Sequence, residues 1–100
     1  MSHRHRRTLE AVFRDPVSAT IVWTDVEAML AHYGAAIREG RGSRVTFKLN
    51  GHRANFHRPH PRKEASRASI LKVRTFVTEA GLEADDEIQG IHGVRRIRPG

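Results

Sequence analysis

These 100 residues are enough for one small domain and too few for two. Lys and Arg total 18 against 11 Asp and Glu, which gives a formal net charge of +7, and hydrophobic residues make up 38%. The absence of cysteine excludes disulfides, thiolate nucleophiles and cysteine-ligated zinc, and no apolar run approaches the roughly 20 residues that span a bilayer. No apolar region follows the basic first residues, so we expect a cytoplasmic protein with no secretory signal and no membrane partner.

Two helices are predicted in the first third of the chain. In residues 5–14, apolar side chains recur at helical spacing, and the Asp-Pro pair at 15–16 ends the pattern. A second helix is predicted to begin at Thr24, which fits a capping box with Glu27, and to end at Gly34. The buried stripes are predicted to hold Leu9, Val12 and Phe13 in the first helix, and Val26, Met29, Leu30 and Tyr33 in the second.

A β-hairpin centred on Asn50-Gly51 follows a short predicted strand at residues 36–38. The Asn-Gly pair favours a two-residue type I′ turn, which sets the register so that Leu49 faces His52 and Arg44 faces His57. Side chains alternate between the two faces of a sheet. One face is therefore apolar, with Val45, Phe47, Leu49, Ala54 and Phe56; the other is polar or cationic, with Arg44, Thr46, Lys48, Arg53, Asn55 and His57.

A last helix over residues 67–79 completes the predicted domain. Ile70, Val73, Phe76 and Val77 share one side of it. The order helix, helix, three strands, helix predicts an α+β fold, in which a small antiparallel three-stranded sheet carries helices on one face and leaves the other face open. Residues 83–100 combine acidic and basic clusters, and we expect a charged tail or a weak added strand.

The positive charge is concentrated in residues 41–63. That stretch holds seven Lys and Arg side chains, three His and no acid, a pattern that favours a polyanionic partner over a merely solvated surface. Both hairpin phenylalanines fall on the apolar face, which argues against a sheet that stacks single-stranded bases. Contacts to RNA phosphates are therefore predicted for Ser43, Arg44, Lys48, Arg53, Asn55, Arg58, Arg62 and Lys63.

His57 and His60 are candidates for catalysis. A neutral imidazole at His57 could abstract the 2′-hydroxyl proton of RNA, while Arg44 or Lys48 stabilises the negative charge of the phosphorane-like state. His60 could protonate the leaving oxygen, so the predicted catalytic residues are His57, Arg44 and His60. The same histidines could instead shape the Pro-rich turn or contact phosphate. They could also form a metal pair, but no third ligand is evident, and we expect neither a metal nor a cofactor.

Four stretches of the chain, in this order, are similar to the HicA toxin family: DVEAML at 25–30, Tyr-Gly at 33–34, EGRGSRVTF at 39–47 and HRPHP at 57–61. The resemblance covers roughly residues 24–82, which leaves residues 1–23 as an N-terminal helical extension and residues 83–100 as the tail. It implies a double-stranded-RNA-binding-domain-like fold. It also implies the toxin of a type II toxin–antitoxin system, an mRNA interferase that cleaves transcripts and is bound by a HicB-type antitoxin.

The sequence departs from the family at one position that matters for catalysis. In the HicA family a catalytic histidine commonly follows the Gly-Ser pair, whereas here Gly42-Ser43 is followed by Arg44. Arginine is a poor acid or base because it stays protonated. Either His57 across the hairpin takes over, or the protein is a non-catalytic RNA-binding or regulatory module. A DNA-binding domain is a third reading, although no predicted helix is conspicuously basic along one face.

Overall fold

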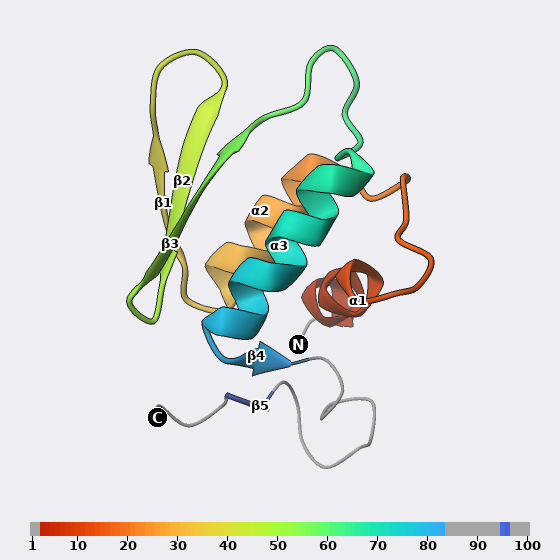
Figure 1. Ribbon diagram of the computed structural model, residues 1–100, viewed down its shortest axis with the longest axis vertical. Coiled ribbons are helices and arrows are strands. Elements are labelled where there is room, and N and C mark those ends of the chain that lie inside the picture. Colours follow the sequence, from red (N-terminus) through yellow and green to blue (C-terminus); the bar gives the residue numbers. More distant parts are fainter. Residues whose placement is uncertain (1–2, 84–94, 97–100) are drawn as a thin grey trace.

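The computed structural model describes residues 3–83 and 95–96 (Figure 1). Its helices are α1 (His3–Val12), α2 (Trp23–His32) and α3 (Arg67–Glu79). Strands β1 (Ala36–Glu39), β2 (Arg44–Leu49) and β3 (His52–His57) form an antiparallel sheet in the order β1-β2-β3. The helices lie on one side of this sheet (Figure 1), so the predicted α+β fold is confirmed.

The β2–β3 hairpin has the predicted register, with Leu49 opposite His52 and Arg44 opposite His57. Asn50 and Gly51 both have positive φ angles, 51° and 83°, as a type I′ turn requires. The Asn50 side-chain amide also donates to the carbonyl of Ala80, at 2.7 Å, which ties the turn to the end of α3. The turn residue that sets the register therefore also helps to dock the hairpin on the helices.

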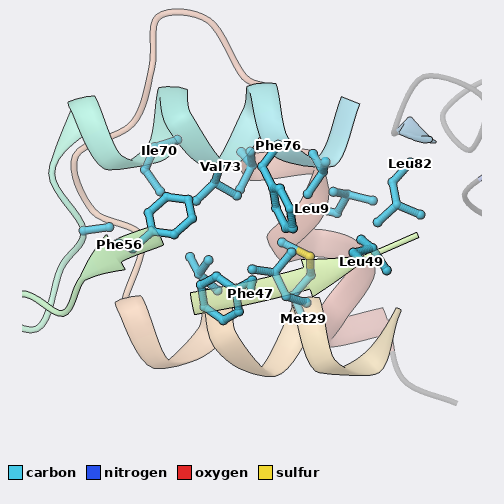
Figure 2. Packing of buried hydrophobic residues seen from close by; sticks show 14 of the residues in the cluster. Leu9, Met29, Phe47, Leu49, Phe56, Ile70, Val73, Phe76 and Leu82 are labelled. Carbon is cyan, nitrogen blue, oxygen red and sulfur yellow. The ribbon is translucent and has the colours of Figure 1, made fainter. Parts of the chain in front are cut away.

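The apolar face of the hairpin forms the centre of the core. Figure 2 shows Phe47 and Phe56 between α2 and α3, among the buried side chains of Ile70 and Val73. The Phe47 and Phe56 rings lie 5.5 Å apart, and Trp23 of α2 lies 5.6 Å from Phe56. Burying a phenylalanine side chain contributes roughly 1.5–3 kcal/mol to folding, so these aromatic rings contribute strongly to the stability of the domain.

α2 begins at Trp23, its N-cap lies two residues before Thr24, the predicted N-cap, and the predicted capping box is wrong. Val22 occupies the N-cap position, and no side chain caps the helix. The backbone N–H of Trp23 instead donates to the carbonyl of Lys63, at 2.8 Å. Glu27 accepts hydrogen bonds from Arg58 and from the Trp23 indole. A carboxylate bonded to a guanidinium gains more than one bonded to a neutral backbone amide, so Glu27 bonds to Arg58 and does not complete a capping box with Thr24.

α1 packs against α2 and α3 as part of the core. Leu9 and Val12 are fully buried, and the Arg74 guanidinium of α3 donates to the Val12 carbonyl at 3.0 Å. This bond satisfies a carbonyl at the C-terminal end of α1. His5 stacks on His32 of α2 with ring centroids 4.6 Å apart. Burial, aided by His32, lowers the pKa of His5.

The ends of the predicted elements shift slightly, and the charged tail forms an added strand pair. α1 spans His3–Val12 where residues 5–14 were predicted, and α3 has its predicted bounds. Strands β4 (Leu82–Glu83) and β5 (Arg95–Arg96) pair antiparallel in a separate two-stranded sheet. The acidic cluster at residues 85–87 and the rest of the predicted tail lie outside the described residues.

Candidate nucleic-acid interface

The open face of the sheet displays the polar residues that the register predicts. Lys48, Arg53 and Asn55 are exposed, and half-buried Thr46 donates a hydrogen bond of 2.6 Å to the Asn55 side-chain oxygen. Lys48 and Arg53 are cross-strand partners. Two like charges directly opposite each other are unfavourable unless an anion lies near both. A hollow of about 490 Å³ on this face is lined by Ala36, Ile37, Arg38, Thr46, Lys48, Arg53 and Asn55.

A second hollow, of about 630 Å³, lies where β3 ends and α3 begins. It brings together His57, His60 and Arg62, which are candidate site residues from the sequence, and Arg67 of α3 joins them. Sequence reasoning missed Arg67 because it lies outside the basic stretch and reaches the site through the fold. The remaining lining residues are Ala19, Arg58, Pro59, Glu64, Ala65, Ser66 and Ser69.

The turn between β1 and β2 lies beside His57. The Ser43 hydroxyl oxygen is 3.4 Å from His57 Nδ1, a contact that can orient the imidazole ring. The Ser43 carbonyl accepts a hydrogen bond of 2.8 Å from the Arg58 backbone N–H. Arg44 is the cross-strand partner of His57. Ser43, Arg44 and His57, all named as candidate site residues from the sequence, therefore lie together at one end of the hairpin.

Arg58 is held by carboxylates of the protein itself. Its guanidinium donates to Glu27 at 2.7 and 3.1 Å and forms an ion pair with Glu39 at 3.4 Å. The hydrogen bond to Glu27 raises the pKa of Arg58. Its charge is therefore largely compensated inside the protein, whereas Arg62 and Lys63 are exposed on the same loop. Sequence reasoning included Arg58 among the phosphate contacts and missed its acidic partners, which come from α2 and β1.

Within the described part of the chain, no group of three or more His, Asp or Glu side chains gathers as a metal-binding cluster. Among these same residues, none of the helices combines the length and the apolar character needed to cross a bilayer. Cations and histidines lie on the open face of the sheet and on the loop that follows β3, and others lie on the three helices.

Fold and surface together define a small basic α+β domain, with a cationic sheet face backed by helices. Residues 23–82 match a family model described as the HicA toxin of bacterial toxin–antitoxin systems. The match covers more than half of the chain, and the chain belongs to the HicA toxin family. The predicted resemblance is thereby confirmed, and α1 precedes the matched region. Comparisons with curated proteins and with solved structures give no match.

Proposed function

We propose that this HicA-family toxin binds mRNA and cleaves it as a metal-independent endoribonuclease, and that a HicB-type antitoxin is its protein partner. The observation that carries the proposal is the hollow beyond β3, which holds His57 and His60 among arginine side chains. Two imidazoles beside cations supply a base, an acid and charge stabilisation, which are the groups that cleavage of a phosphodiester requires. The family supplies the toxin–antitoxin context.

In the proposed reaction, His57 removes the proton from a ribose 2′-hydroxyl. The 2′-oxygen then forms a bond to the adjacent phosphorus, and the bond from phosphorus to the 5′-oxygen breaks. His60 gives its proton to that leaving oxygen, so the products are a 2′,3′-cyclic phosphate and a 5′-hydroxyl. Arg44, which lies opposite His57, stabilises the negative charge on the phosphoryl oxygens during the transfer. Ser43 orients the His57 ring through the 3.4 Å contact.

The open sheet face supports binding to the RNA backbone. No Phe, Tyr or Trp side chain of β1–β3 lies on this face, since Phe47 and Phe56 are buried in the core. Base stacking therefore has no platform here, whereas Lys48, Arg53 and the Asn55 amide offer donors to phosphate oxygens. We infer that Lys48 and Arg53 contact consecutive phosphates of a strand whose scissile group lies near His57.

The test is cleavage of a mixed-sequence RNA by the purified protein in the presence of EDTA. His57→Ala and His60→Ala should each reduce the rate on the order of 10²- to 10⁴-fold, as expected for loss of a general base or acid. His52→Ala is the matched control, because His52 is an exposed histidine at the other end of β3. Cleavage by His57→Ala at the rate of the unmodified protein would overturn the assignment of His57.

A second candidate function is RNA binding without cleavage. Arg44 favours it, because this position follows the Gly-Ser pair after which HicA-like toxins commonly carry a histidine, and arginine does not act as a base. This candidate predicts RNA binding that weakens with salt and no cleavage with or without added divalent metal. A preference for duplex DNA over RNA in competition would instead indicate a DNA-binding domain.

A further inference from the structure

The loop that carries His60 is anchored at both ends to the first turns of α2. At its start, the Arg58 guanidinium donates two hydrogen bonds to Glu27 of α2. At its end, the Lys63 carbonyl accepts a hydrogen bond of 2.8 Å from the backbone N–H of Trp23. The adjacent residues continue this attachment through a β-bridge between residues 22 and 64. Residues 58–63 are therefore fixed to one helix on both sides of His60.

Glu27 is the centre of the anchor at Arg58. One of its carboxylate oxygens accepts from Arg58 Nε at 2.7 Å and from the Trp23 indole at 2.5 Å, and the other accepts from Arg58 Nη2 at 3.1 Å. The Glu27 side chain is 17% exposed and the Arg58 side chain 31%. A two-pronged bond between a carboxylate and a guanidinium fixes direction as well as distance. Glu27 thus holds Arg58 in one orientation.

Glu39 contacts the same guanidinium in a weaker way. It makes a single ion pair at 3.4 Å, and its side chain is 72% exposed. Exposed ion pairs of this kind contribute little to structure, because solvent screens them and the side chains remain mobile. The chain therefore offers two glutamates that contact one arginine and differ mainly in geometry and burial.

We propose that Glu27 is a positioning residue for the nuclease. By fixing Arg58, it sets the place of His57 immediately before Arg58 in the chain and of His60 two residues after it. Glu27 lies on α2 and does not line either hollow, so it acts through Arg58 and is not itself catalytic. This inference rests on the proposed RNA cleavage, and it adds to that proposal a residue that charge patterns do not reveal.

Electrostatics and positioning make opposite predictions for Glu27. Replacing it with glutamine removes one negative charge beside the cationic loop, residues 58–63, and leaves Arg58 free to bind phosphate. RNA binding should therefore be retained or become tighter. An inhibitory, purely electrostatic role would therefore predict equal or faster cleavage. A positioning role predicts slower turnover despite retained binding, because a small displacement of catalytic groups costs much of the rate.

The experiment compares Glu27→Gln with Glu39→Gln, which makes the same change of charge at the same arginine. We expect kcat to fall on the order of tenfold to a hundredfold in Glu27→Gln, with KM unchanged or lower, and to stay within about twofold in Glu39→Gln. Glu27→Asp keeps the charge and is expected to recover part of kcat. An unchanged kcat in Glu27→Gln, or an equal loss in both glutamine variants, would overturn the inference.

A second readout separates this inference from the proposed function. The ring signals of His57 and His60 are recorded by two-dimensional NMR in the three variants, with core methyl signals reporting that each is folded. We expect both ring signals to shift or broaden in Glu27→Gln and to stay in place in Glu39→Gln. If the unmodified protein does not cleave RNA, the proposed nuclease fails. In that case, the positioning role is also overturned if the ring signals of His57 and His60 stay in place in Glu27→Gln. If the glutamine variant does not fold, the same NMR comparison is made with Glu27→Asp.

Discussion

The helical side and the open side of the β2–β3 hairpin are built by the same two strands, yet they differ in almost every physical property. On the helical side, Val45, Phe47 and Phe56 are buried against the helices. On the open side, Lys48 and Arg53 are exposed and face each other. Because side chains alternate along a strand, one face can specify the fold while the other is free to carry charge. Stability and RNA recognition should therefore be largely separable in the hairpin.

The two sides meet where β3 ends. There the Arg58 side chain of the cationic loop reaches Glu27, an acid on the helical side of the domain. The loop with His60 is thereby attached to α2 and not to the sheet alone. The separation of fold and function that we expect along the hairpin ends at this point, and substitutions at Glu27 should affect both.

The largest effect expected on the helical side is from Phe47→Ala. Phe47 is fully buried, with ring contacts to Trp23, Phe56 and Phe76. Loss of this ring leaves a cavity, and the free energy of unfolding should fall by roughly 3–5 kcal/mol, measured by urea denaturation. The control on the open side is Lys48→Ala, which should change the free energy of unfolding by less than about 0.5 kcal/mol. Equal losses in the two variants would contradict the proposed separation of the two sides.

A smaller and different effect is expected on the open side. Lys48→Gln and Arg53→Gln should each reduce the slope of log binding constant against log salt by about 1, since each removes one of the proposed phosphate contacts. Stability should stay the same or rise slightly, because either change relieves the repulsion between the paired cations. Filter binding of RNA over a range of salt concentrations measures the slope. Arg7→Gln, an exposed change on α1, is the control and should leave the slope unaltered.

The smallest effect expected is a pH dependence of the helical side. Burial first, then His32 and Arg4, lower the pKa of His5, while Asp25 opposes them. A histidine whose pKa is lowered by folding stabilises the folded state above its unfolded pKa of about 6.5, and this contribution is lost as the pH falls below that value. The thermal midpoint should therefore drop between pH 8 and 5.5, and the drop should be smaller in His5→Gln.

The control for this prediction is His52→Gln, which changes an exposed histidine at the hairpin turn. An equal flattening of the pH dependence in His5→Gln and His52→Gln would show that the stack of His5 on His32 has no special part in it. A flattening confined to His5→Gln would show that α1 is docked on α2 in a pH-sensitive way.

The sequence by itself determined the features that depend on neighbours in the chain. The Asn50-Gly51 turn fixed the hairpin register, and alternation then assigned Phe47 to the core and Lys48 to the open face. The spacing of apolar residues in residues 67–79 likewise identified the buried side of α3. The charge of residues 41–63 indicated a candidate nucleic-acid surface. The ordered stretches indicated the HicA family, which the match over residues 23–82 confirms.

The tertiary structure alone decided which partners the polar side chains take. Glu27 was predicted to cap its own helix, but Arg58, 31 residues away in the chain, offers a stronger charged bond, and the capping box does not form. The fold likewise brings Arg67 into the hollow with His57 and His60. A local pattern shows which bonds a side chain can make, whereas the fold sets which competing partners lie within reach.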